Sequence, residues 1–431
     1  MGINEFAARV KQASIQLAAV SGEQKNDALK RIAEAIAARE QEIIRANEAD
    51  LERSRRENLA EPLIKRLKFD QNKITETVDG INSLIQLADP VGKTLLATEL
   101  DDGLELYKVT CPIGVIGVIF ESRPDALVQI SSLCLKSGNG VLLKGGSEAM
   151  ETNRMLADII IQATAGAGIP EGWLYLLETR SEVNEMLQAD EHIDLLIPRG
   201  SNEFVRYIMD NSKIPVMGHA DGICHLYVDA GADLDMAVKL AVDSKTQYVA
   251  VCNAAETLLV HQKAAKEFLP KLEKALAQEQ VEMIGCAETA AIVGVTPATE
   301  ADWGAEYLDY KLSIKVVAGL EEAIGHINRY GSGHTDSIVT ADSQAASKFM
   351  SLVDSGNVYW NCSTRFSDGF RYGFGAEVGV STSKIHARGP VGLEGLLIYK
   401  FKLIGKGHIV ADYAERVKTF KHNDINKPCP I

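Results

Sequence analysis

Residues 114–125 (GVIGVIFESRPD) and residues 138–149 (GNGVLLKGGSEA) decide the fold class of this chain. Each contains a short apolar run, VIGVIF from Val115 and VLLK from Val141, bordered by glycine, proline and small polar residues that favour turns. Similar runs follow in WLYLL (173–177), IDLLI (193–197) and IPVM (214–217), with helical stretches between them. This alternation predicts an α/β fold whose mostly parallel sheet is wrapped by helices.

The regions outside these runs extend the pattern in both directions. The first ninety residues predict helices, because apolar residues recur at helical spacing, as in Leu29, Ile32, Ala33 and Ile36. A second series of short strands is expected near ICHLYV, ETLLVH, SIKVV, DSIVT and NVYWN. Towards the end, LLIYKFKL (396–403) and GHIV (407–410) are strand-like, and the polar tail is expected to fray.

Length and composition bound the class of protein. A chain of 431 residues exceeds the ~250 to 300 that one core supports, so two large lobes are expected. The formal charge of −14 disfavours nucleic acid and anionic membranes as partners. Seven widely spaced cysteines without a CxxC pair indicate reduced thiols, and no signal peptide or ~20-residue apolar run is present. We therefore expect a cytoplasmic protein acting on small molecules.

The turn after VLL is the best candidate for binding a nucleotide, since no GxGxxG follows the early strands. Lys144 suits ribose or phosphate oxygens, Gly145 and Gly146 permit close approach of the backbone, and Ser147 stands near the start of a helix. An ordinary strand-to-helix turn with a surface lysine is the alternative.

Cys252 is the candidate nucleophile, because it lies between a helical region and the strand-like ETLLV, with polar Asn253 beside it and Glu256 nearby. A free cysteine is otherwise a small buried hydrophobe, and local composition leaves both readings open. Arg365, in the hydroxyl-rich NCSTRFSDG, suits a carboxylate or phosphate, although loop arginines are usually only solvated. His219 and His225 near Cys224 lack the regular spacing of a zinc motif, so no metal is expected.

Taken in order, eight segments resemble the glutamate-5-semialdehyde dehydrogenase (gamma-glutamyl phosphate reductase) family, a branch of the aldehyde dehydrogenase superfamily. The resemblance covers nearly the whole chain. The segments are GVIGVIFESRPD, GNGVLLKGGSEA, IDLLIPRGS, IPVMGHADGICHLYVD, CNAAETLLVH, EYLDYKLSIKVV, GSGHTDSIVT and residues 361–396.

The resemblance implies roles and regions. Cys252 is the implied nucleophile, and the implied cofactor contacts are Lys144 and Ser147 at the adenosine ribose, Gly200 and Ser201 at the phosphates, and Glu306 at the nicotinamide ribose. Gly145 and Gly146, between Lys144 and Ser147, are also expected to bind the cofactor. It implies a dinucleotide-binding domain over residues 1–226 with an oligomerisation hairpin near residues 94–110. A catalytic domain over 227–380 and a return segment with oligomerisation strands over 381–431 are also implied.

Two departures from the wider superfamily sharpen the expected chemistry. The glutamate that activates water in hydrolytic relatives maps onto Gly218, so a thioester at Cys252 should exchange with phosphate rather than water. The oxyanion-hole asparagine maps onto Ser122, so Ser122, Asn253 or another group is expected to join a backbone N–H at Cys252 as donor. The neutral Ser147, where many NAD-preferring relatives are acidic, favours NADP(H).

The implied activity is NADPH-dependent reduction of L-glutamyl 5-phosphate to L-glutamate 5-semialdehyde and phosphate, on the route to proline. Substrate contacts are expected from Ser363, Thr364 and Arg365, with Arg123 near the acyl phosphate. A homo-oligomer and a transient contact with a separate glutamate 5-kinase are also expected. The competing readings are a non-phosphorylating aldehyde dehydrogenase and a cysteine acyltransferase without nicotinamide.

Overall fold

The computed structural model describes residues 2–178 and 182–431, which fall into two compact units. The first unit comprises residues 1–201, 207–216 and 392–431, and the second comprises residues 202–206 and 217–391. The expected functional regions 1–226, 227–380 and 381–431 stay a prediction. None of the helices in the described part of the chain is long and apolar enough to cross a membrane.

The first unit begins with the expected helices. They are α1 (Ile3–Leu17), α2 (Gly22–Ala38), α3 (Glu40–Arg56), α4 (Glu61–Leu67) and α5 (Gln71–Gln86). Ser21 caps α2 by accepting a hydrogen bond from the Gln24 amide, and the predicted stripe from Leu29 to Ile36 is buried. Local capping and an apolar face together explain why these helices form.

A four-stranded parallel sheet forms the centre of this unit, in the order β5-β4-β3-β6. Its strands are β3 (Val115–Phe120), β4 (Gly140–Gly145), β5 (Leu174–Leu177) and β6 (Leu195–Arg199). The helices α6 (Pro124–Ser137), α7 (Met150–Ala165), α8 (Glu182–Leu187) and α9 (Asn202–Asn211) connect or follow them. Every residue of VIGVIF is buried, which confirms the predicted α/β architecture.

The strand expected at IPVM is wrong. Only an isolated bridge joins Val216 to Leu196, beside a hydrogen bond from the Leu196 amide to the Pro215 carbonyl. Proline has no N–H, so Pro215 cannot continue a ladder.

The second unit is built on a seven-stranded sheet in the order β10-β9-β11-β8-β7-β12-β13. Its strands are β7 (Cys224–Val228), β8 (Ala255–His261), β9 (Glu282–Gly285), β10 (Thr296–Pro297), β11 (Lys311–Val317), β12 (Thr335–Val339) and β13 (Asn357–Trp360). The paired strands are parallel. All five expected strands are present, and the short β9 and β10 were not predicted.

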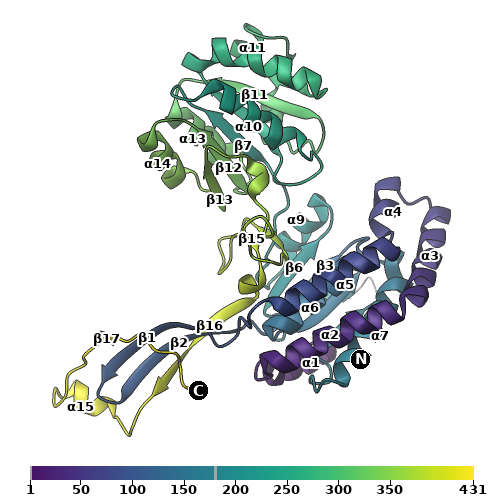
Figure 1. Ribbon diagram of the computed structural model, residues 1–431, viewed down its shortest axis with the longest axis vertical. Helices are drawn as coiled ribbons and strands as arrows, with labels where there is room; N and C mark the ends of the chain where they lie inside the picture. The colour runs from purple at the N-terminus through teal and green to yellow at the C-terminus, as the bar shows by residue number, and fades with distance from the viewer. Residues whose placement is uncertain (1, 179–181) are drawn as a thin grey trace. The chain divides into compact units, whose positions relative to one another are not determined.

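Helices cover both faces of this sheet (Figure 1). One apolar core joins the strands to α10 (Leu234–Thr246) and α11 (Gln262–Gln278), and another joins them to α13 (Leu320–Tyr330) and α14 (Ser343–Leu352). Shorter elements are α12 (Ala287–Ala290), the 3-10 turns η2 (Glu300–Gly304) and η3 (Thr364–Phe366), and the hairpin β14 (Gly379–Ser381) with β15 (Gly389–Val391).

A separate four-stranded sheet belongs to the first unit and pairs distant parts of the chain in the order β16-β2-β1-β17. The expected hairpin is β1 (Thr94–Asp101) with β2 (Leu104–Pro112), and β16 (Leu397–Ile404) pairs antiparallel with β2. GHIV is not a strand, because Val410 starts the short helix α15 (Val410–Ala414). The tail is also more ordered than expected, since β17 (Asn423–Asp424) pairs with β1.

Candidate functional site

Cys252 lies in the turn between α10 and β8 and is half-buried. The Ala254 amide closes this turn on the Val251 carbonyl, and the Cys224 thiol donates to the Cys252 carbonyl at 3.2 Å. Gly222 approaches the turn so closely that a Cβ there would lie 2.1 Å from the Cys252 carbonyl oxygen. Glycine at 222 is therefore required for the observed position of the Cys252 backbone.

Two histidines that sequence reasoning did not connect with Cys252 lie beside it. One ligand atom from each of His219, Cys252 and His334 falls within 4.8 Å of the others. His219 Nδ1 lies 2.8 Å from the Val380 carbonyl oxygen, and His334 Nδ1 lies 2.8 Å from Thr335 Oγ1. Imidazoles at this position can take up the thiol proton or bind an electrophile together with the sulfur.

Arg365, expected to bind substrate, is held close to the same turn. Thr364 Oγ1 donates to the Asn253 carbonyl at 2.7 Å, and Ser363 Oγ caps the Arg365 amide. Arg365 is 7% exposed as a residue, and its Nε donates to Gln247 Oε1 at 2.9 Å. It forms no ion pair with a carboxylate of the described residues, and burial lowers its pKa. A buried guanidinium of this kind is suited to an anionic ligand.

The two expected oxyanion donors are already engaged. Asn253 Nδ2 donates to the Ser367 carbonyl at 2.8 Å. In the first unit, Ser122 is buried with φ of 47°, and its amide and hydroxyl both donate to Glu148 Oε1, at 2.6 and 2.9 Å. Either residue must exchange its present partner before it can donate to a substrate oxygen. Arg123 follows Ser122 at the start of α6 in the first unit.

The candidate nucleotide turn joins β4 to the 3-10 turn η1 (Ser147–Ala149). Lys144 is 5% exposed and donates to the Gly145 carbonyl, so this lysine does not lie on the surface. A Cβ at Gly145 would lie 2.2 Å from Asn153 Nδ2, and one at Gly146 would overlap the Glu148 carboxylate. Ser147 is exposed.

Arg53 of α3 was not foreseen beside this turn. Its guanidinium donates to the Ser147 carbonyl at 2.9 Å and to the Glu148 carbonyl at 3.2 Å, and pairs with buried Asp50. About a quarter of the Arg53 side chain is exposed. A cation therefore stands next to the neutral Ser147.

The other expected cofactor residues lie at α9 and before β11. Gly200 and Ser201 are exposed immediately before α9, and the Ser201 amide donates to Glu121 Oε2 at 3.1 Å. In the second unit, the Glu306 carboxylate accepts from the Asn202 side chain and from the Gly222 amide, at 2.9 Å for the latter. Glu306 is thereby connected through Gly222 to the turn that carries Cys252.

A buried ion pair lies behind the Cys252 turn. Lys245 Nζ and Glu256 Oε2 are 2.6 Å apart and neither side chain is exposed. The Leu308 amide also donates to Glu256 Oε1 at 3.2 Å. Burial raises the pKa of Glu256 to about 7 despite Lys245. This pair joins the last turn of α10 to β8, the two elements that flank Cys252.

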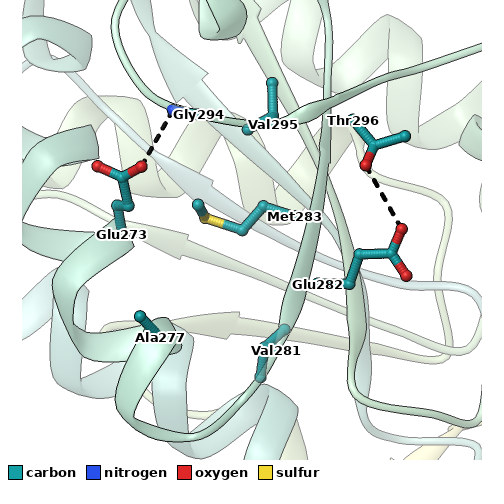
Figure 2. Close-up of a pocket in the computed structure, with 8 residues that line it drawn as sticks. All are labelled: Glu273, Ala277, Val281, Glu282, Met283, Gly294, Val295 and Thr296. Carbon is teal, nitrogen blue, oxygen red and sulfur yellow. Dashed lines mark hydrogen bonds between the residues drawn. The ribbon is translucent and has the colours of Figure 1, made fainter.

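A hollow of about 450 Å³ lies at the β10 edge of the seven-stranded sheet, between α11 and the strands β9 and β10 (Figure 2). Its polar walls are already satisfied, since Glu273 accepts from the Gly294 amide and Thr296 donates to Glu282. None of the predicted site residues lines it. This hollow therefore lies apart from the candidate residues around Cys252.

Comparisons with known proteins show the family of this chain. Residues 2–301 match the model of the aldehyde dehydrogenase family. The gamma-glutamyl phosphate reductase of Acetivibrio thermocellus is 71% identical over 431 residues, covering 100% of both chains. That of Pelotomaculum thermopropionicum is 72% identical over 427 residues, covering 99% of this chain and 98% of the relative.

A solved structure extends the match to the backbone. The crystal structure of gamma-glutamyl phosphate reductase from Thermotoga maritima is 44% identical and superposes with a TM-score of 0.92. The match covers 94% of this chain and 99% of that one. This chain therefore belongs to the gamma-glutamyl phosphate reductase family, a branch of the aldehyde dehydrogenases.

Proposed function

We propose that this chain reduces L-glutamyl 5-phosphate to L-glutamate 5-semialdehyde and phosphate, with NADPH as hydride donor and Cys252 as nucleophile. The names of its full-length relatives support the reaction. The observation that carries the residue assignment is Arg365, a buried arginine without a carboxylate partner among the described residues. Its neighbour Thr364 donates to the Asn253 carbonyl in the Cys252 turn. The product holds an amine and an aldehyde that close to a cyclic imine, which is a step towards proline.

The reaction divides into two steps at Cys252. The Cys252 thiolate attacks the γ-carbonyl, the tetrahedral intermediate expels phosphate, and a thioester remains on the enzyme. When bound, NADPH would supply the hydride that reduces the thioester carbonyl at Cys252 to the thiohemiacetal level. Collapse of that adduct releases the aldehyde and regenerates the thiol. The buried glycine at position 218 offers no carboxylate base, so water should compete poorly with phosphate for the thioester.

Arg365 is proposed to bind the α-carboxylate of the substrate, assisted by the hydroxyl groups of Ser363 and Thr364. The guanidinium fork matches a carboxylate in two parallel hydrogen bonds. Arg123 is proposed nearer to the acyl phosphate, and Ser122 and Asn253 are proposed as oxyanion donors that change partner when substrate binds.

The residues at the candidate nucleotide turn fit NADPH. The exposed Ser147 adds no negative charge, and Arg53 donates to its carbonyl, so a 2′-phosphate would meet a cation rather than a carboxylate. Lys144, Gly145 and Gly146 are proposed at the adenosine ribose, Gly200 and Ser201 at the diphosphate, and Glu306 at the nicotinamide ribose.

One assay tests the reaction and the residues together. Purified chain with glutamate 5-semialdehyde should reduce NADP only when phosphate is present, and Cys252→Ser should abolish this reduction. Arg365→Lys should raise the KM for the semialdehyde about 10- to 100-fold, the cost of losing a charge-assisted hydrogen bond. Arg388→Lys, whose partner Asp354 is exposed, is the matched control and should leave KM unchanged.

The competing functions predict different results in this assay. Reduction of NADP without phosphate identifies a non-phosphorylating dehydrogenase, and acyl transfer without change at the nicotinamide absorbance band identifies an acyltransferase. Full activity of Cys252→Ser would refute the nucleophile.

The antiparallel sheet is proposed as a self-association surface of a homo-oligomer. Large apolar side chains on it are exposed, including Leu95, Phe401 and Leu403 at 54%, 59% and 58%. Exposed apolar patches of this kind mark interaction sites. Contact with a separate glutamate 5-kinase and the preference for NADP over NAD stay predictions.

A further inference from the structure

We propose that His219, Cys252 and His334 form a binding site for a single Zn²⁺ ion, which reversibly blocks the thiol. One nitrogen from each imidazole and the sulfur lie within 4.8 Å of one another, and all three residues belong to the second unit. Two imidazoles and one thiolate are ligands that Zn²⁺ prefers, and three protein ligands leave a fourth position for water or an anion.

The hydrogen bonds around both histidines suit metal binding. The Val380 carbonyl can only accept, so His219 Nδ1 at 2.8 Å carries a proton, which makes Nε2 the ring nitrogen that binds a metal in the neutral imidazole. Thr335 Oγ1, at 2.8 Å, can accept the Nδ1 proton of His334. Metal-ligating histidines commonly donate their second nitrogen to a carbonyl or hydroxyl oxygen in this way.

The second observation that points to a ligand is the Nε2 atom of His334. His334 is fully buried, and its Nε2 has no hydrogen-bond partner among the described residues. A buried polar atom without a partner is costly, and a bound cation would satisfy it. The proposed function uses the sulfur of Cys252 but leaves this nitrogen unexplained.

The required rearrangement is small. With Zn–N near 2.0–2.1 Å and Zn–S near 2.3 Å, tetrahedral geometry places ligand atoms roughly 3.5 Å apart. The atoms must therefore approach by up to about 1.3 Å from the present limit of 4.8 Å. His219 and Cys252 are only half-buried, so rotation of their side chains can supply this movement.

The three ligands come from loops that precede neighbouring parallel strands. His334 directly precedes β12, Cys252 lies three residues before β8, and His219 lies five residues before β7, which pairs with both. On binding, the Cys252 thiol loses its proton to solvent and a Zn–S bond forms, without change in oxidation state. The sulfur lone pair needed for attack on an acyl phosphate is then engaged by the metal.

The test measures metal binding directly, with reduced, metal-free full-length chain. Titration with Zn²⁺ in a calorimeter should give one tight site per chain, absent in Cys252→Ser and weakened at least about tenfold in His219→Gln and His334→Gln. Cys286→Ser is the matched control, since this half-buried cysteine lies outside the cluster and contacts Thr289. It should bind Zn²⁺ like the wild-type chain.

Substitution by Co²⁺ adds a spectroscopic readout. A thiolate-to-cobalt charge-transfer band should appear in the near ultraviolet and be lost in Cys252→Ser. Because His334 is buried, circular dichroism must show that its variant is folded. If it is not, the half-buried His219→Gln decides the histidine contribution.

Several outcomes would overturn the site: no stoichiometric binding, binding retained in Cys252→Ser, or equal affinity in a folded histidine variant. The blocking of turnover rests on the proposed function, whereas the metal site does not. A chain that binds one Zn²⁺ through Cys252 but reduces no acyl phosphate would refute the function and keep the site.

Discussion

Replacing Gly222 by alanine should impair chemistry at Cys252 far more than it impairs folding. The added Cβ would lie 2.1, 2.4 and 2.6 Å from the carbonyl oxygen, Cα and carbonyl carbon of Cys252. All three are backbone atoms, so no side-chain rotation relieves the overlap. To restore even the 3.0 Å below which real Cβ contacts essentially never occur, the Cys252 carbonyl oxygen must move by about 1 Å.

The size of this displacement sets the expected loss. A misplacement of about 1 Å in a reacting group costs on the order of 10²-fold in rate. Overpacking of this kind costs about 1–3 kcal/mol in the free energy of unfolding. The Gly222 amide also donates to Glu306, so the proposed ribose contact should weaken at the same time.

The assay compares kcat, the rate of Cys252 alkylation by iodoacetamide, and the unfolding midpoint in urea. Gly325→Ala is the matched control, because Gly325 lies within α13 of the same unit and its Cβ would meet nothing within 4 Å. It should keep full activity and gain about 0.5–1 kcal/mol in stability. Wild-type kcat and alkylation rate in a folded Gly222→Ala chain would refute the close-approach argument.

Two further predictions concern charge. Because burial raises the pKa of Glu256 to about 7, the folded chain binds this proton more tightly than the unfolded chain. The contribution of Glu256 to the free energy of unfolding should therefore be full below about pH 4.5 and decline as the pH rises towards about 7. Glu256→Gln should remove this dependence of the unfolding free energy on pH, measured by urea unfolding. The same pH dependence in both chains would contradict the prediction. Ser147→Glu should raise the KM for NADPH on the order of tenfold while sparing NADH, because a carboxylate would stand beside the 2′-phosphate and compete for Arg53. Equal changes for both cofactors in steady-state kinetics would argue against this placement.

Much of the fold could be predicted because its strands are short, apolar and separated by turn residues. VIGVIF became β3 and ETLLVH fell in β8 because full burial on a parallel sheet demands continuous apolar runs. The prediction of a strand at IPVM was wrong because it rested on apolar composition and did not take into account that Pro215 has no N–H to donate. The strand β9 was missed because Glu282 is exposed and the element is only four residues long.

The site could be predicted only in part from sequence. Cys252 and Arg365 stand in distinctive motifs, and the structure brings their loops together through Thr364. His219 and His334 come from separate loops, and only the order of β8, β7 and β12 in the sheet places them beside Cys252. The sequence signal that could have identified these two histidines is their position shortly before β7 and β12, the first and second strands beyond β8 in the sheet. Arg53 gave no local signal, since it is one of three arginines near the end of α3.

The pairing of β2 with β16 has a consequence for the order of events during synthesis. About 285 residues separate the end of β2 from the start of β16, and a ribosome needs roughly 15 to 60 seconds to add them. Throughout this interval the nascent β2 has an open edge that could pair with a neighbouring polypeptide. Lys108, whose ammonium later covers the ring of Tyr399, places a charge on that edge from the start. The same lysine thus deters premature association and afterwards stabilises the completed sheet.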